Sequence, residues 1–194
     1  VADQQDGRFI VLCYGIFQQR DEIAPLLLRS VLKFVEHPEP EFRVEALLEQ
    51  EQPEIRMLVN AAGCGVFGPF AEADRKKLIS SAQLNSLALT GMCHASLPYM
   101  HSGSNIINMG SNSAWQPVPF QAVYGASKSY VLSLSRALGR ELRPQGIHVM
   151  CVCPGWIKTD FMAVARDTKN GRTVRRFPFA LRPETVARRA LRDS

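Results

Sequence analysis

Residues 105–128 read NIINMGSNSAWQPVPFQAVYGASK, a short apolar run followed by turn residues and the start of a helical pattern. The run at 105–109 has the length and residue types of a buried strand. The helical pattern continues over 122–143. A strand that leads through a turn into a long helix is the unit from which parallel sheets flanked by helices are built.

The same alternation extends over the rest of the chain. Short apolar runs predict strands at residues 8–14, 55–60 and 148–153. Helices are expected at 21–35, at 40–51, over roughly 70–100 with at most one interruption, and from Pro183 onward. No linker or internal repeat divides the 194 residues, which is the usual size of one domain. We therefore expect a single α/β domain over 1–194.

The composition is that of an ordinary globular protein, with 46% hydrophobic and 21% charged residues, which excludes disorder and fibrous repeats. The apolar runs are too short to span a bilayer, and no secretory leader opens the chain. A net charge of +5 gives little support for a nucleic-acid partner. The arginine-rich last quarter is interpreted as a solvated helix face and a loop.

The cysteines and histidines do not form a metal-ligand pattern. The five cysteines are Cys13, Cys64, Cys93, Cys151 and Cys153. Their spacing contains no zinc-type doublet, and the four histidines form no ligand spacing. We expect buried free thiols, a cytoplasmic protein and no metal site.

A glycine motif follows the strand at 55–60. Gly63-Cys-Gly65-Val-Phe-Gly68 fits the G-x-G-x-x-G pattern of dinucleotide-binding turns. That fingerprint also requires an acidic residue about 20 positions later. No Asp or Glu occurs between Asp74 and Glu141. The motif is therefore interpreted as a turn that lines a cleft at the carboxyl end of the strand.

The candidate chemistry centres on Tyr124 and Lys128, four residues apart on one helix face. An ammonium beside a phenol favours the phenolate and lowers its pKa, which makes a general acid/base for an alcohol or a carbonyl. Ser111 follows the strand at 105–109, where a hydroxyl can donate to a substrate oxygen. Two further residues are ambiguous. Asn85 is either structural or catalytic, and Thr159 is either a helix N-cap or a ligand contact.

Four segments together resemble the short-chain dehydrogenase/reductase family, in its single-domain branch, over roughly residues 42–192. They are IRMLVNAAGCGVFGPF (55–70), LNSLALTGMCHASLPYM (84–100), residues 105–128 and CVCPGWIKTDF (151–161). The resemblance implies a Rossmann-type doubly wound parallel sheet with helices on both faces. It also implies NAD or NADP as cofactor and the interconversion of a carbonyl and an alcohol.

The resemblance further implies a role for each matching residue. Tyr124 exchanges the proton with the substrate, Lys128 lowers its pKa and holds the nicotinamide ribose, and Ser111 orients the carbonyl. Asn85 holds a water of the proton relay through its backbone, and Asn60 ties neighbouring strands together. The residues expected around the cofactor are Asn60, Ala62, Gly63, Tyr124, Lys128, Pro154, Gly155, Ile157 and Thr159, with Ala62 and Gly63 on its adenosine side.

The start of the chain departs from the family. The family opens with T-G-x-x-x-G-x-G after its first strand, whereas residues 8–22 (RFIVLCYGIFQQRDE) contain one glycine, Gly15. The chain begins with Val1 and stops short of the family's last strand. A truncated or frame-shifted copy, incomplete at both ends, is therefore expected. The alternative function is a non-catalytic fragment or pseudoenzyme that binds no cofactor. A nucleotide-sugar epimerase fits less well, because it needs a C-terminal substrate domain.

Substrate and assembly are also predicted. Apolar residues flank the motifs and favour a hydrophobic carbonyl or secondary alcohol; they are Trp115, Pro117, Phe120, Trp156, Phe161 and Met162. The helical patterns at 78–100 and 122–143 carry apolar residues on more than one face. One face is expected to cover the sheet and the other to form a two-fold homodimer.

Overall fold

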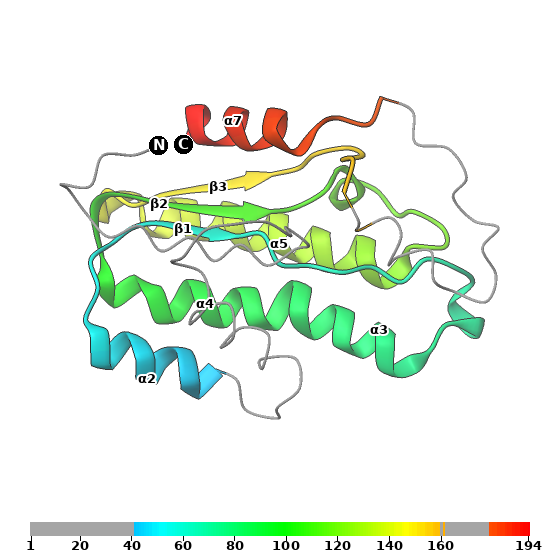
Figure 1. The fold of residues 1–194 in the computed structure, drawn as a ribbon, viewed down its shortest axis with the longest axis horizontal. Coiled ribbons are helices and arrows are strands. Elements are labelled where there is room, and N and C mark those ends of the chain that lie inside the picture. Colours follow the sequence, from blue (N-terminus) through cyan, green and yellow to red (C-terminus); the bar gives the residue numbers. More distant parts are fainter. Residues whose placement is uncertain (1–40, 160, 162–178) are drawn as a thin grey trace.

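The fold is built on a parallel sheet of three strands in the order β1-β2-β3 (Figure 1). The computed structural model describes residues 41–159, 161 and 179–194. The strands are β1 (Ile55–Asn60), β2 (Met100–Met109) and β3 (His148–Val152). The expected strand at 8–14 and the expected helix at 21–35 lie outside the described residues.

Helices connect the strands, as parallel pairing requires. The connections are α3 (Arg75–Ala82), a π-helical turn (Gln83–Ala88) and α4 (Leu89–Ser96) between β1 and β2, and α5 (Ala122–Glu141) between β2 and β3. Helix α2 (Glu41–Glu51) precedes β1, and α7 (Pro183–Asp193) follows β3. Single 3-10 turns cover Phe70–Glu72, Leu97–Tyr99, Asn112–Ala114 and Arg143–Gln145. Figure 1 shows α4 and α5 on one side of the sheet and α7 on the other. The predicted α/β fold with helices on both faces of a parallel sheet is confirmed.

Two helix starts follow local sequence signals. Asp74 caps α3, because its carboxylate accepts hydrogen bonds from the backbone N–H groups of Lys76 and Lys77 at 2.7 and 3.3 Å. These bonds lower the pKa of Asp74. Helix α7 begins at Pro183, as predicted, because proline suits the first helical turn.

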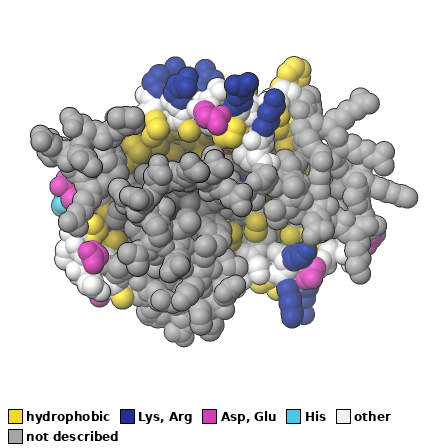
Figure 2. Space-filling view, viewed as in Figure 1, with side chains coloured by type: hydrophobic (Ala, Val, Ile, Leu, Met, Phe, Trp, Pro, Cys, Tyr) yellow, Lys and Arg dark blue, Asp and Glu magenta, His cyan; other side chains and the backbone are white. Residues whose placement is uncertain are grey.

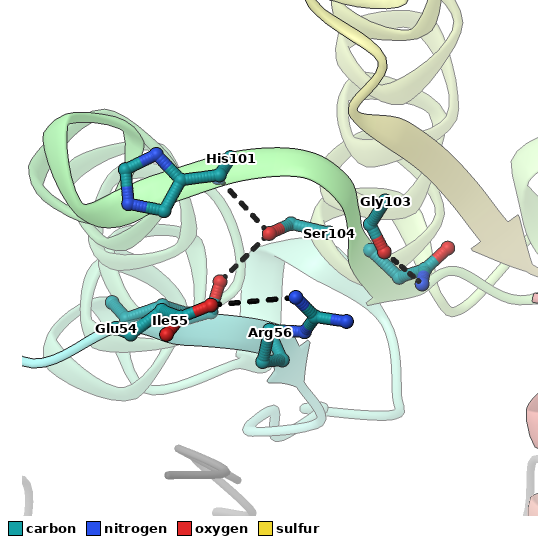
Figure 3. Close-up of polar contacts among 7 residues, drawn as sticks. Glu54, Ile55, Arg56, His101, Gly103 and Ser104 are labelled. Carbon is teal, nitrogen blue, oxygen red and sulfur yellow. Dashed lines mark hydrogen bonds and ion pairs between the residues drawn. The ribbon is translucent and has the colours of Figure 1, made fainter. Parts of the chain in front are cut away.

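Strand β2 begins five residues earlier than predicted, at Met100 instead of residue 105. The polar residues 101–105 hide this part of the strand from a pattern search. Figure 3 shows how Ser104 holds it: its hydroxyl donates to the Ile55 carbonyl over 2.9 Å and accepts from the His101 N–H over 3.1 Å. The pairing register between β1 and β2 shifts in the same place, between Ile55 and Met57. The strand is irregular here, so its apolar periodicity is lost.

The main hydrophobic core joins the sheet to the helices that cover it. Ile55, Leu58, Ile106 and Val131 are fully buried, and α2 contributes Val44 and Leu48 to the same cluster. Burial of one such side chain stabilises a fold by about 1.5–3 kcal/mol. This core fixes β1, β2 and α5, the elements that carry the candidate site.

The cysteines within the described residues are free thiols: Cys64, Cys93, Cys151 and Cys153. The prediction of buried free thiols is confirmed for Cys93, whereas the other three are free but only half-buried, because they lie at the edge of the sheet and not in its core. Cys13 lies outside the described residues. Over the described part of the chain, no helix is both long enough and apolar enough to cross a membrane.

Candidate active site

The three loops that carry the sequence motifs leave the same edge of the sheet, because the carboxyl ends of parallel strands lie together. Backbone bonds hold two of these loops side by side. The Gly110 N–H donates to the Val152 carbonyl over 2.8 Å, and the Asn112 N–H donates to the Pro154 carbonyl over 2.9 Å. The motif after β2 is thus fixed against the motif after β3.

Tyr124, Lys128 and Ser111 come together at this edge. Tyr124 and Lys128 lie one turn apart on α5, and the Lys128 ammonium is 5.8 Å from the centroid of the Tyr124 ring. The same ammonium donates to the carbonyl of Met109, the last residue of β2, over 2.7 Å. Ser111 forms a side-chain hydrogen bond with Tyr124. The arrangement is a phenol, an ammonium and a hydroxyl within one cluster.

Burial sets the pKa values of this cluster. It raises the pKa of Tyr124 above its ordinary value, and the hydrogen bond with Ser111 opposes that rise. Burial also lowers the pKa of Lys128 to about 8, while the thiols of Cys151, Cys64 and Cys153 act in the other direction. The sequence predicts a pKa of Tyr124 below its ordinary value, whereas in the cofactor-free structure this pKa lies above it, because the buried phenol has lost its water.

Aromatic rings surround the phenol. The ring centroid of Tyr124 lies 5.7 Å from that of Phe67 and 5.5 Å from that of Phe161. The centroids of the two phenylalanine rings are 6.1 Å apart. A Cβ added at Gly65 would come within 2.9 Å of the Phe67 ring and 3.1 Å of the Phe161 ring. A glycine is therefore required at residue 65 for these rings to converge. Sequence reasoning missed the role of Phe67, because ring contacts between distant segments leave no spacing signal.

Asn85 joins the loop after β1 to α5. Its side-chain oxygen accepts from the Cys64 N–H over 3.0 Å, and its amide donates to the Cys64 carbonyl over 2.8 Å and to Ser127 Oγ over 3.0 Å. These bonds use the whole side chain in structural contacts. Asn85 also lies in the π-helical turn, so only its backbone is left for a proton relay.

Gly63 lies against this same cluster. A Cβ added there would come within 3.0 Å of Asn85 Oδ1 and 3.3 Å of Lys128 Nζ. Gly63 therefore lies beside Lys128, the candidate catalytic lysine. The family resemblance instead assigns Gly63 to the adenosine side of the cofactor. Ala62, the preceding residue, is half-buried in the same loop.

The side chain of Asn60 forms its hydrogen bonds inside the core. Its amide donates to Asn108 Oδ1 over 2.8 Å and to Cys93 Sγ over 3.3 Å, and only 6% of the residue is exposed. It ties β1 to β2, in agreement with the role that the resemblance implies.

The loop after β3 is held by a short bridge to the segment before α7. Ile157 pairs with Leu181; the Lys158 N–H donates to the Leu181 carbonyl, and the Leu181 N–H donates to the Trp156 carbonyl, both over 2.9 Å. The Thr159 N–H donates to the Ile157 carbonyl over 2.9 Å. Gly155 is exposed next to Asn112. Met162, and the residues that would decide whether Thr159 caps a helix, lie outside the described residues.

The described residues fit the nicotinamide end of a dinucleotide. An ammonium has three protons, and among the described residues Lys128 has one acceptor, the Met109 carbonyl, so two protons can serve ribose hydroxyls. The space beside it is kept open by Gly63, whose position a Cβ would fill. The segment expected to hold the pyrophosphate lies within residues 1–40, outside the described part. Within that part, no group of three or more His, Cys, Asp or Glu could hold a metal ion.

Known proteins match much of this chain. The sequence model described as short chain dehydrogenase matches residues 41–170. A 3-ketodihydrosphingosine reductase of Bacteroides thetaiotaomicron is 35% identical over 113 residues, which are 57% of this chain and 42% of that protein. A human 3-oxoacyl-[acyl-carrier-protein] reductase is 30% identical over 141 residues, which are 72% of this chain and 58% of that protein. The chain thus spans about half the length of these relatives.

Solved structures share the fold. A bulky-bulky ketone specific alcohol dehydrogenase from Comamonas testosteroni matches with a TM-score of 0.63 and 27% identity, over 81% of this chain and 58% of its own. A short-chain dehydrogenase from Sphingobium yanoikuyae, solved in complex with NADPH, matches with a TM-score of 0.69 and 25% identity. That match covers 94% of this chain and 72% of the other.

Proposed function

Because this chain belongs to the short chain dehydrogenase family, we propose that it interconverts a carbonyl and an alcohol with NAD or NADP as cofactor. The observation that carries the proposal is the buried phenol of Tyr124. It shares a side-chain hydrogen bond with Ser111, and the Lys128 ammonium lies 5.8 Å from the centroid of its ring. When bound, the cofactor supplies the hydride in reduction and accepts it in oxidation. Lys128, Gly63 and the loop from Pro154 to Thr159 are the described groups that would hold it.

The proton steps follow from the residues themselves. The raised pKa of Tyr124 keeps the phenol protonated at neutral pH, so it can give its proton to a carbonyl oxygen as that oxygen becomes an alkoxide. Ser111 donates a hydrogen bond to the same oxygen and stabilises the developing charge. Lys128 stabilises the phenolate that remains, through its nearby positive charge. In the direction of oxidation, the phenolate removes the proton from the alcohol.

An apolar ketone is the substrate class that these surroundings support. Phe161 contacts the Tyr124 ring, and Trp115 and Phe120 are 59% and 50% exposed on the loop that leads into α5. Two relatives are named as reductases of 3-oxoacyl or 3-keto compounds. Substrates with a ketone next to an aliphatic chain are therefore the first to test.

A homodimer is part of the proposal. Ile79 on α3, Leu87 in the π-helical turn and Tyr130 on α5 are 47%, 56% and 40% exposed. We call these three residues the α3–α5 face. A 2.8 Å hydrogen bond between Thr90 Oγ1 and the Tyr130 hydroxyl links α4 to α5 at this surface. A second copy of the same face would bury these side chains by two-fold symmetry.

The alternative is a non-catalytic member of the family. The observation that favours it is the content of residues 8–22, where one glycine stands in place of the family's three. Such a chain would keep the geometry around Tyr124 without binding a hydride carrier.

The test is an assay of the purified chain with aliphatic ketones and millimolar NADH or NADPH, followed at the absorbance of the reduced nicotinamide. We expect turnover, and a loss of about 10²–10⁴-fold in kcat for Tyr124→Phe. Tyr130→Phe, on the same helix but outside the cluster of Tyr124, Lys128 and Ser111, is the matched control and should keep its rate. Equal rates for Tyr124→Phe and the parent would overturn the assignment of Tyr124. Absence of turnover with both cofactors would favour the non-catalytic alternative.

A further inference from the structure

We propose that Ser113 is a positioning residue of the active site, which holds Ser111 so that Ser111 acts as a hydrogen-bond donor. The inference rests on the proposed function and adds to it a residue that the family motif does not supply. It concerns the direction of one hydrogen bond, between Ser111 and the phenolic oxygen of Tyr124.

The geometry places Ser113 directly against Ser111. Ser113 lies in the 3-10 turn that follows β2, and only 5% of it is exposed. Its hydroxyl donates to Ser111 Oγ over 3.0 Å, and its backbone N–H donates to the same oxygen over 3.2 Å. Ser111 is the N-cap of this turn and has an extended backbone with φ −165°. One residue thus supplies two donors to one oxygen.

Counting protons and lone pairs fixes what Ser111 can do. A serine hydroxyl has one proton and two lone pairs. The two donors of Ser113 occupy both lone pairs, so Ser111 is left with its own proton to donate. One acceptor in reach is Asn112 Oδ1 at 3.3 Å, which is long for a bond between two oxygens. The phenolic oxygen of Tyr124, which shares a side-chain hydrogen bond with Ser111, is the other acceptor, and a substrate carbonyl beside it would be a third.

The direction of this bond matters for Tyr124. A donor to the phenolic oxygen favours the phenolate, which is why the bond with Ser111 lowers the pKa of Tyr124 against the effect of burial. Among the described residues, the groups that face Tyr124 are Ser111, the Lys128 ammonium and the rings of Phe67 and Phe161. Without the Ser113 hydroxyl, a lone pair of Ser111 becomes free to accept the phenolic proton, which favours the neutral phenol instead.

The test is an NMR titration of the cofactor-free chain labelled with ¹³Cζ-tyrosine, with the Tyr124 signal assigned through Tyr124→Phe. We expect Ser113→Ala to raise the pKa of Tyr124, and Ser113→Thr, which keeps a hydroxyl, to restore it. In an active enzyme, Ser113→Ala should also lower kcat about tenfold. The titration needs neither substrate nor cofactor, so its failure is distinguishable from failure of the proposed function.

Two controls separate positioning from a general structural effect. Ser129→Ala removes a hydroxyl that bonds the carbonyls of Ala114 and Gly125, next to the same turn, and should leave the pKa of Tyr124 unchanged. In the background of Ser111→Ala, a further Ser113→Ala should produce no additional shift. If Ser113→Ala does not fold, Ser113→Cys takes its place, because a thiol is a weak donor. An unchanged pKa of Tyr124 in the folded variant, or an equal shift in Ser129→Ala, would overturn the inference.

Discussion

Asn60 and Asn108 lie opposite each other on β1 and β2, and the Asn60 amide donates a hydrogen bond to Asn108 Oδ1 over 2.8 Å. The Asn108 amide in turn donates to Ser135 Oγ on α5 over 3.0 Å. Both asparagines are buried, so each of these bonds replaces water that the groups have lost. The network joins two strands to the helix that carries Tyr124 and Lys128.

Loss of this bond should destabilise the fold. Asn60→Ala removes the amide donor and leaves the buried Asn108 oxygen without it, so we expect the free energy of unfolding to fall by about 1–3 kcal/mol. Gln116→Ala, at an exposed amide, should change it by less than about 0.5 kcal/mol. Urea unfolding of the two variants and the parent provides the measurement. Equal stabilities for Asn60→Ala and Gln116→Ala would contradict a structural role for the pair.

Lys128 should make stability depend on pH. Its pKa falls from an ordinary 10.5 to about 8 in the folded protein, so between these values the unfolded chain binds more protons than the native one. The free energy of unfolding should therefore rise as pH increases above about 8. Burial of Cys93 and Cys151 raises their pKa values from 9.0 to about 11 and about 12, which has the opposite effect above pH 9.

The measurement is urea unfolding of the cofactor-free protein between pH 7.5 and 9, below the range where the thiols dominate. Lys128→Met should remove the rise, whereas Lys158→Met, at an exposed lysine, should retain it. Parallel curves for Lys128→Met and the parent would show that the ammonium is not buried as described.

Local sequence signals were sufficient to predict several of the strands and helices. The apolar runs at β1 and β3 and the long periodic pattern of α5 predicted those elements, because each is regular and bounded by turn residues. The four-residue spacing of Tyr124 and Lys128 predicted that they share one helix face, since helical geometry alone fixes that relation. The family motifs then brought Ser111 to the same site.

Features that depend on distant contacts could not be predicted. Residues 83–88 read as ordinary helix, and the π-helical turn there accompanies the bonds of Asn85 to Cys64 and Ser127. The pKa of Tyr124 was predicted in the wrong direction, because spacing reveals a neighbouring charge but not the extent of burial. Ser113 escaped notice for a similar reason: its role depends on the direction of a hydrogen bond.

The α3–α5 face should hold two chains together. Leu87→Glu places a charge in the proposed interface, so we expect it to shift a dimer to a monomer at micromolar concentration. Leu191→Glu is a matched control, because Leu191 on α7 has the same 56% exposure outside that face. Sedimentation or light scattering measures the mass. A folded parent chain that is monomeric would refute the dimer, and dissociation by Leu191→Glu alone would move the interface to α7.

Cofactor affinity decides between the two candidate functions. A pyrophosphate is bound by backbone N–H groups of a glycine turn at a helix N-terminus, where a Cβ blocks close approach. Residues 16–19, after Gly15, are Ile, Phe, Gln and Gln, all with bulky side chains. The glycine motif at 63–68 has no acidic residue at the position that would hold the ribose, and Gly65 lies against aromatic rings. We therefore expect the 194-residue chain to bind nicotinamide cofactors weakly.

Titration of the purified chain with NADH and NADPH, followed by the fluorescence of the reduced nicotinamide, measures this affinity. If binding is weak, turnover should require millimolar cofactor. The side chains around Tyr124 are in place for the reaction, but residues 8–22 lack the glycine turn that binds the pyrophosphate. Lys128→Met should weaken any remaining affinity, since it removes the donors expected to hold the ribose. Binding at micromolar concentration would contradict the interpretation that residues 8–22 cannot hold a pyrophosphate. If Lys128→Met then abolished this binding, the cofactor would be assigned to the site around Lys128.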